Sequence, residues 1–318
     1  MNQKTPEQVK NLESMSIQFH DALFRKILDE KTIISILSTT SNLDRQIIRL
    51  FYKKKFSNPI QQDIKCQLSS VLRDLTIDLF DLPYEYDARE LHRALTLNKK
   101  EEKTIIEIII TRPRKHLILV QKIYKKFYNT SLKNDILKLS ENNKELSQFS
   151  QFLITVLSSQ RPTNQTIEIN DAYNIAKDMI KDSIKQYGIN VELFKKVFVE
   201  KSREDLILIS RAFFDLYKKS LYESINQEIS GKNKRLIKDI LFAIITPAQY
   251  FAKKAYKAMK GAGTDENTLF RVIISRAEID MDDIREYYFR DWNTDLRNDI
   301  DGDCSGAYGK ILMNLSQK

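Results

Sequence analysis

The chain has 318 residues, enough to bury a sizeable core, and its 52 basic and 43 acidic residues leave a net charge of +9. This excess suits an anionic partner, either nucleic acid or anionic lipid, although a generally solvated basic surface would explain it equally well. The longest apolar runs, such as residues 104–111, are far shorter than the ~20 residues of a membrane span. We therefore expect no transmembrane helix.

The start of the chain is polar. Its first residues, MNQKTPEQVKNLESM, lack the apolar core of a signal peptide. Cys66 and Cys304 are too few for a disulfide framework, so we expect both to be reduced thiols. These features predict a cytoplasmic protein with a short N-terminal head at residues 1–14.

Four segments with one shared pattern follow one another along the chain. Each begins with an apolar half-helix, passes a short polar junction, and resumes with apolar residues three and four apart up to an aromatic pair. This pattern is typical of two amphipathic helices with a tight connection. The segments are residues 35–56, 107–128, 196–217 and 271–292. With almost no period-two alternation, the sequence predicts an all-α protein built from an internal repeat.

The spacing of the copies sets their boundaries. Helix-start residues Asp29, Glu101, Asn190 and Asp265 recur at a little over seventy residues, with a longer gap between the second and third. Such a unit has room for about five helices of average length, and prolines end the first and third units. We expect repeats at residues 15–83, 84–157, 171–247 and 248–318, with residues 158–170 as a linker.

The fourth copy contains the stretch MKGAGTDE at residues 259–266. Gly261 and Gly263 are two of only seven glycines in the chain, and without side chains they let a loop turn its carbonyl oxygens outward. Thr264 is the expected N-cap of the next helix, and the acidic pair after it favours the positive start of that helix. Further on, GDCSG supplies a carboxylate, Asp303.

With its four copies, its longer second connection and these paired motifs, the chain resembles the annexins, a family of four-repeat helical proteins that bind membranes through calcium. The resemblance covers about residues 15–318 and implies four annexin-type repeats of about five helices each. It also implies a Ca²⁺ site made by the carbonyls of Met259, Gly261 and Gly263 with a bidentate Asp303 carboxylate. Because Ca²⁺ takes roughly 6 to 8 oxygens, positions remain open for lipid phosphate.

A second interpretation of the same region, as an EF-hand calcium loop, can be excluded. The aspartates of DIDGDCSG alternate as in an EF-hand loop. The required glycine would fall on Cys304, however, and the bidentate glutamate on Lys310.

The first two copies depart from the motif, and both calcium sites are expected to be lost. The replacements are Arg25, Ile27 and Gln67 in the first copy and Leu97, Lys99 and Leu139 in the second. Their loops could instead meet an anionic membrane, since each basic residue near such a surface is worth ~1 kcal/mol. The residues concerned are Arg25, Lys26, Lys99 and Lys100. Simple drift of exposed loops is the alternative.

The third copy is intermediate. It keeps Gly188, and Glu228 follows at the separation found between Gly263 and Asp303. By resemblance, the carbonyls of Ser183, Gln186 and Gly188 with Glu228 would hold a second ion, against the alternative of a vestigial loop. Tyr187 at the loop tip could enter the lipid interface or pack on its own loop.

No catalytic triad, P-loop, dinucleotide fingerprint or transition-metal cluster is visible, and His20, His92 and His116 have no partner at a telling spacing. The basic-aromatic runs at 51–56 and 124–128 end amphipathic helices, which favours core aromatics and solvated lysines over nucleic-acid binding. The sequence thus predicts a non-enzymatic protein that binds acidic phospholipid membranes peripherally through Ca²⁺. The alternative is a calcium-independent scaffold that binds cytoskeletal or other protein partners through a basic surface.

Overall fold

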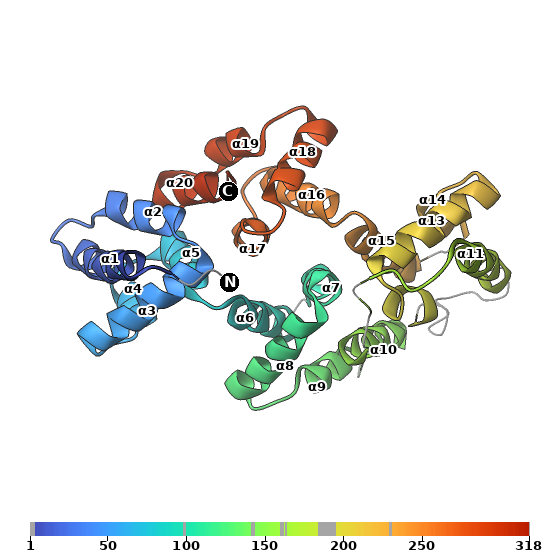
Figure 1. Ribbon diagram of the computed structural model, residues 1–318, viewed down its shortest axis with the longest axis horizontal. Coiled ribbons are helices and arrows are strands. Elements are labelled where there is room, and N and C mark those ends of the chain that lie inside the picture. The colour runs from blue at the N-terminus through green and yellow to red at the C-terminus, as the bar shows by residue number, and fades with distance from the viewer. Residues whose placement is uncertain are drawn as a thin grey trace. The chain divides into compact units, whose positions relative to one another are not determined.

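The structure is a computed structural model that describes residues 4–97, 100–140, 144–159, 162, 164–183, 195–228 and 231–317. Within these ranges the regular structure is helical, with no strand, which confirms the predicted all-α class (Figure 1). No helix in the same ranges is long and apolar enough to cross a membrane.

Five helices recur in the first and fourth copies. The first copy contains α1 (Pro6–Phe24), α2 (Glu30–Thr39), α3 (Asn42–Phe56), α4 (Ile60–Gln67) and α5 (Ser70–Phe80). The fourth contains α16 (Pro247–Met259), α17 (Glu266–Arg276), α18 (Met281–Trp292), α19 (Leu296–Asp303) and α20 (Gly306–Leu315).

The second and third copies follow the same order. The second contains α6 (Pro83–Thr96), α7 (Glu102–Thr111), α8 (Arg114–Tyr128), α9 (Leu132–Leu137), the 3-10 turn η1 (Lys138–Ser140) and α10 (Lys144–Ser158). The third contains α11 (Ile169–Ser183), the π-helical turn η2 (Lys195–Val199), α13 (Arg203–Tyr217), α14 (Leu221–Glu228) and α15 (Gly231–Ile245).

The long middle helix of every copy ends in the same way. Its C-cap residue adopts the left-handed conformation, with φ between 54° and 57°, and donates its N–H to the carbonyl four residues earlier. These residues are Ser57, Asn129, Lys218 and Asn293. The repeat is therefore a repeat of local backbone conformation as well as of apolar pattern.

A tyrosine–aspartate hydrogen bond, buried in the first and second copies and part-buried in the fourth, ties this middle helix to the next one. The pairs are Tyr52–Asp63 at 2.6 Å, Tyr124–Asp135 at 2.8 Å and Tyr288–Asp299 at 2.6 Å. The third copy has buried Phe213 and Ser224 at the corresponding positions, so both partners of the bond are replaced together.

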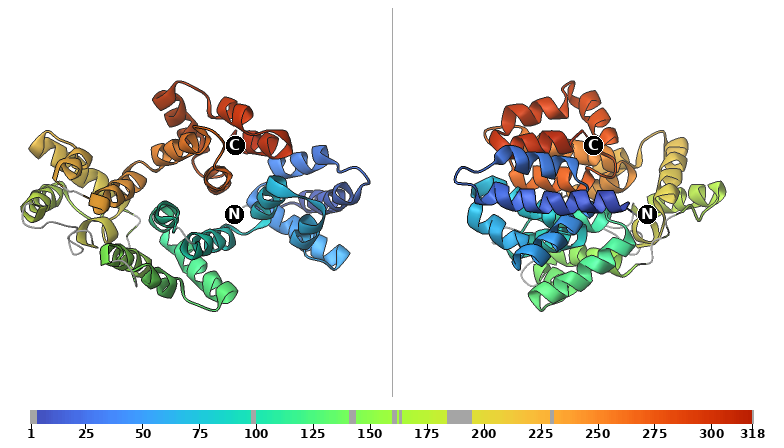
Figure 2. Two further views of the ribbon diagram at one scale, coloured as in Figure 1. Left: turned by 180° about the vertical axis from the view of Figure 1, so that it is seen from behind. Right: turned by 60° about the vertical axis from the view of Figure 1, so that its left-hand side comes forward.

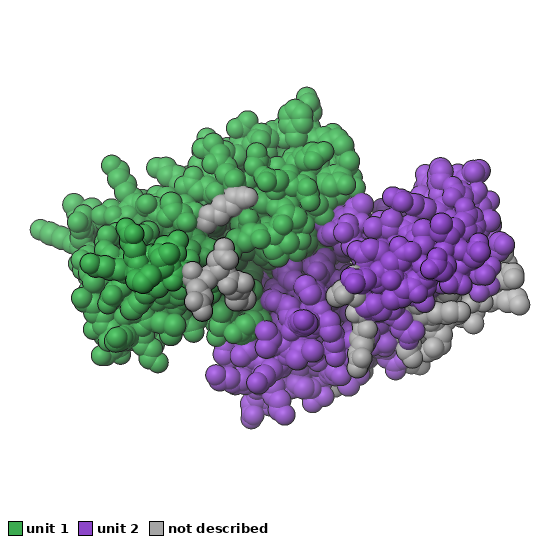
Figure 3. All heavy atoms as spheres, in the orientation of Figure 1, with its two compact units in different colours: residues 1–86, 248–318 green, residues 87–247 purple. Residues whose placement is uncertain are grey.

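The helices form two compact units, residues 1–86 with 248–318 and residues 87–247 (Figure 3). In the first unit α2 packs on α20, and α5 packs on α17 and α20, so the first and fourth copies lie side by side (Figure 2). In the second unit α7 packs on α15. The first copy is thus paired with the fourth, and the second with the third.

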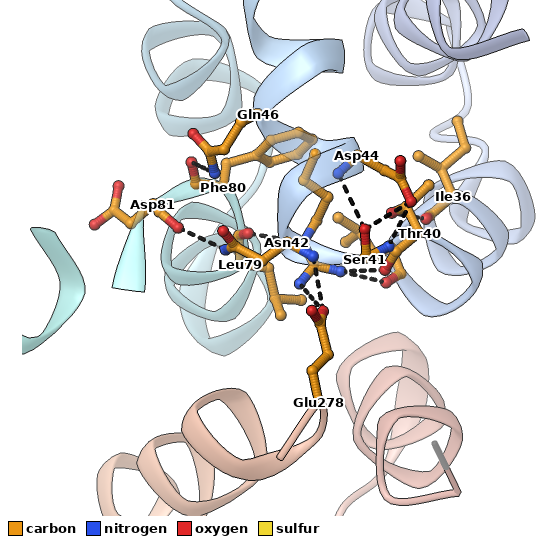
Figure 4. A network of polar contacts seen from close by, with 12 residues as sticks. Ile36, Thr40, Ser41, Asn42, Asp44, Gln46, Leu79, Phe80, Asp81 and Glu278 are labelled. Carbon is orange, nitrogen blue, oxygen red and sulfur yellow. Dashed lines mark hydrogen bonds and ion pairs between the residues drawn. The ribbon is translucent and has the colours of Figure 1, made fainter. Parts of the chain in front are cut away.

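A polar network joins the first copy to the fourth (Figure 4). Arg45 is 4% exposed and donates to the carbonyls of Leu79 at 2.8 Å and Thr40 at 2.6 Å. Glu278 accepts from the N–H of Asn42 at 2.7 Å and lies 3.7 Å from the Arg45 guanidinium. Burial lowers the pKa of Arg45 to about 10, so the guanidinium stays charged at neutral pH and holds carbonyls that would otherwise be unsatisfied.

Candidate functional site

The loop between α16 and α17 has the backbone that its glycines allow. Gly261 has φ of +127° and Gly263 of +94°, a region that residues with side chains rarely adopt. Nothing lies within 4 Å of the place where a Cβ would stand at either glycine. The backbone conformation, and not crowding, therefore requires these glycines, and the loop around them is open.

Asp265 closes this loop and begins α17. Its N–H donates to the carbonyl of Ala258 at 2.7 Å, and its carboxylate accepts from the N–H of Thr268 at 3.1 Å. The prediction that Thr264 is the N-cap was therefore wrong. Asp265 takes that position because its carboxylate reaches the orphan N–H of the first turn, while the Thr264 hydroxyl is engaged elsewhere.

Thr264 instead connects the loop to Asp303. Its hydroxyl donates to Asp303 Oδ2 at 2.9 Å, and Asp303 is the exposed last residue of α19. A carboxylate has about four lone-pair sites, so this bond leaves capacity for further contacts. Sequence reasoning missed this role of Thr264. The available signal was its position next to Gly263, which precedes Asp303 by the same separation as Gly188 precedes Glu228.

Tight packing fixes the chain just beyond Asp303. Cys304 is buried, and a Cβ at Gly309 would lie 2.2 Å from the Cys304 carbonyl oxygen, so α20 can approach this connection only with glycine there. Burial raises the pKa of the Cys304 thiol to about 11, although a hydrogen bond with Tyr308 lowers it. This cysteine is therefore a packed, protonated thiol that supports the loop.

The aspartates before Asp303 belong to a helix. Asp299 lies in α19 and accepts from the Tyr288 hydroxyl at 2.6 Å and from Thr294 at 2.8 Å. Asp301 is exposed on the same helix. This arrangement agrees with the exclusion of an EF-hand.

The corresponding loop of the first copy has the same closure without glycines. The N–H of Asp29 donates to the carbonyl of Ala22 at 3.2 Å, as Asp265 does to Ala258. Arg25 pairs with Asp29 at 2.9 Å, which offsets part of its charge, whereas Lys26 is exposed. Ile27 is 83% exposed at the tip of the loop.

The second copy closes its loop through Glu101, whose N–H donates to the carbonyl of Ala94 at 3.1 Å. Arg93 pairs with the Glu101 carboxylate at 2.7 Å. Lys100 is exposed and Leu97 is 40% exposed. Lys99 lies outside the described residues.

The predicted site of the third copy is described only at its edges. Ser183 is the last residue of α11, and Glu228 is the last residue of α14. Gln186, Tyr187 and Gly188 lie outside the described residues, so the proposed ion and membrane contacts of this copy stay predictions.

One histidine has a carboxylate partner that its sequence spacing did not reveal. His116 Nε2 lies 2.7 Å from Asp87 Oδ2, and Arg112 contacts the same carboxylate through Nε at 2.8 Å and Nη2 at 3.0 Å. Burial raises the pKa of Asp87, but Arg112 and His116 outweigh it and hold the pKa at about 2. With Arg112 and Asp87 both buried, this cluster is a structural ion pair.

The donor chemistry of the fourth copy fits calcium better than a transition metal. Among the described residues, no three His, Cys, Asp or Glu side chains gather to hold a metal ion. A site there would use backbone carbonyls of the glycine loop and a single carboxylate, the hard oxygen ligands that Ca²⁺ prefers.

The sequence of this chain is similar to those of known proteins. The annexin family model matches four segments, residues 16–79, 86–143, 174–240 and 250–315. Human annexin A4 is 32% identical over 291 residues, 90% of this chain and 88% of its own. Mouse annexin A13 is 30% identical over 287 residues, 90% of this chain and 89% of its own.

Solved structures show the same fold. Annexin III superposes with a TM-score of 0.89 at 27% identity, covering 96% of this chain and 94% of its own. A calcium-bound annexin (Sm)1 superposes with a TM-score of 0.85, covering 99% and 92%, and at 23% identity this match concerns the fold alone.

Proposed function

The chain belongs to the annexin family, whose members are generally calcium-dependent phospholipid-binding proteins, and on this premise we propose that it binds acidic phospholipid membranes peripherally when calcium is present. In a cell it would be cytoplasmic and recruited to membranes when calcium rises. No catalytic activity is part of this proposal.

We assign the main site to the fourth copy. Its ligands would be the carbonyls of Met259, Gly261 and Gly263 and the carboxylate of Asp303. The observation that supports this most strongly is the 2.9 Å bond from Thr264 to Asp303, which holds the carboxylate against the glycine loop. Bound there, Ca²⁺ would supply positive charge and open coordination positions for lipid phosphate oxygens. Ser183, Gln186, Gly188 and Glu228 would form a second site.

Calcium affinity without a membrane should be weak. One coordinating carboxylate per site is nearer to the ~10⁻⁴ to 10⁻³ M class of calcium sites than to tight buffers. Lipid should strengthen the apparent calcium affinity because it binds the calcium-bound state of the protein. Titration calorimetry that detected submicromolar calcium binding without lipid would contradict this assignment.

The test is liposome pelleting with Asp303→Asn. The variant should lose most of its calcium-dependent binding to phosphatidylserine vesicles, because the site loses its only carboxylate. Asp301→Asn is the matched control, since it removes an equal charge from the same exposed helix end. Equal pelleting of wild type and Asp303→Asn at every calcium concentration would rule out this site.

The first two loops support a weaker, calcium-independent contact. Ile27 is 83% exposed beside the exposed Lys26, and Leu97 and Lys100 are exposed in the second loop. With Arg25 and Lys99, four basic residues at ~1 kcal/mol each give at most ~4 kcal/mol, a millimolar affinity. Neutralising all four residues should abolish pelleting with anionic vesicles in chelator at low salt. If the variant pelleted as the wild type does, or if the wild type did not pellet at all, these loops would be exposed segments whose sequence has simply drifted.

A further inference from the structure

Helix α8, labelled in Figure 1, has an unusual solvent-exposed side, which we call its outward face. Leu117, Val120 and Tyr124 are buried on one side. Lys115, Lys122 and Lys126 are exposed, and their spacing of seven and four residues puts them in a row on the opposite side. The 15-residue helix also carries Arg114 and Lys125 and has no acidic residue. Its solvent side is therefore a row of cations.

Two apolar side chains lie within this row. Ile118 is 48% exposed and Leu119 is 42% exposed, one on each flank of the line from Lys115 to Lys122. Single exposed apolar residues are common on protein surfaces. Here the two apolar side chains flank the lysines, so the face offers apolar contact beside positive charge.

The fold itself does not require this composition. The corresponding helices of the other copies all carry carboxylates, namely Asp44 in α3, Glu204, Asp205 and Asp215 in α13, and Asp282, Asp283, Glu286 and Asp291 in α18. In the part of the chain that the structure describes, Lys115, Lys122, Lys125 and Lys126 make no ion pair. Their charges are thus available to a partner.

The start of α8 lies away from the loop that we propose to meet the membrane in the second copy, whereas its end packs on α6, where Tyr128 stacks on His92 at a ring-centroid distance of 3.5 Å. The loop precedes the start of α7, and α8 follows the other end of that helix. Ten residues of helix separate them by about 15 Å. A partner could therefore reach the first turns of α8, which carry Lys115, Ile118 and Leu119, while the loop faces lipid.

We propose that the outward face of α8, defined by Lys115, Ile118, Leu119, Lys122 and Lys126, binds an acidic amphipathic helix of a protein partner. Apolar residues of that helix, spaced by three and four, would cover Ile118 and Leu119, and flanking carboxylates would meet the lysines. Nucleic acid fits less well, since phosphates would pair with the lysines but leave the apolar pair without a contact.

The test uses a fluorescent synthetic peptide of about 20 residues, long enough to form a helix. It is made of Glu, Leu and Ala, with leucines along one face, and binding is followed by anisotropy with the full chain in chelator. A scrambled peptide of equal composition has no apolar face. Lys115→Glu/Lys122→Glu/Lys126→Glu should weaken binding about tenfold, and Ile118→Gln/Leu119→Gln should weaken it several-fold.

Matched controls decide the outcome. Lys53→Glu/Lys54→Glu/Lys55→Glu makes the same charge change on α3, where all three lysines are exposed, and should leave binding unchanged. Absence of peptide binding, equal binding of the scrambled peptide, or equal loss in the α3 variant would overturn the proposal. The proposal would also be overturned if phosphatidylserine vesicles or poly-uridine RNA bound to α8 and Ile118→Gln/Leu119→Gln left that binding unchanged. Such a result would show that the surface binds anions through charge alone.

Discussion

A single hydroxyl connects the two loops of the proposed calcium site. Thr264→Val keeps the size of the side chain but removes the 2.9 Å bond to Asp303. A hydrogen bond to a charged group contributes about 1.5 to 3 kcal/mol in general, and less at an exposed position. We therefore expect the calcium concentration for half-maximal vesicle binding to rise about fivefold, since Asp303 would no longer be held near the glycine loop.

Ser305→Ala is the control for this experiment, because it removes a nearby hydroxyl that makes no capping bond. Circular dichroism should show both variants to be folded. An unchanged calcium midpoint in Thr264→Val would mean that Asp303 does not need this support.

The ion pair around Asp87 predicts a pH dependence of stability. Its folded pKa of about 2 lies below the ~3.9 of an unfolded aspartate, so its contribution is complete above about pH 4 and is lost as pH falls toward 2. Asp87→Asn should cost about 3 to 5 kcal/mol because the buried Arg112 guanidinium loses the charge of the Asp87 carboxylate. Urea unfolding followed by circular dichroism between pH 2 and 6 should be less pH-dependent in the variant; parallel curves would contradict this.

At the scale of elements, a tyrosine–aspartate pair joins two helices in three copies, whereas the third copy has Phe213 and Ser224 in its place. Tyr52→Phe should destabilise the protein by about 1 to 3 kcal/mol, because buried Asp63 loses a donor. Adding Asp63→Ser reproduces Phe213 and Ser224 of the third copy and should cost less than the two single changes together. A double-mutant cycle in urea measures this, and strict additivity would argue against coupling.

The sequence predicted the helices well because apolar spacing is a local property. The sequence did not predict features that depend on the path of the chain or on contacts between distant residues. Thr264 and Asp265 are both good N-caps by type, and only the path of the chain selects Asp265. The partners Asp87 and His116 are 29 positions apart, and Asn42 and Glu278 are 236 apart, so no local pattern connects them. The proposed ligand positions could be predicted only because glycine, which is rare in this chain, marks unusual backbone conformations.

At the scale of the whole molecule, the order of copies along the chain differs from their pairing. The first copy packs against the fourth, through α2 on α20 and α5 on α17 and α20, while the second and third form their own unit. The helices that follow the proposed calcium ligands, α17 and α20, therefore help to cover the core of the first copy. Stability in the first copy should depend on the fourth more than on its neighbour in sequence.

A chain that ends at residue 246 tests this dependence. It retains α7 and α15, which pack on each other, but removes α17 and α20 from α2 and α5 and removes Glu278 from Asn42. Ile33, Leu37 and Leu79, which are 0–1% exposed, belong to the helices that would be uncovered. Because local opening follows the loss of buried apolar contact, amide hydrogen exchange should become faster in α2 and α5 and stay slow in α7 and α15. Equal acceleration in both units, or unchanged protection in α2 and α5, would show that the first copy does not rely on the fourth.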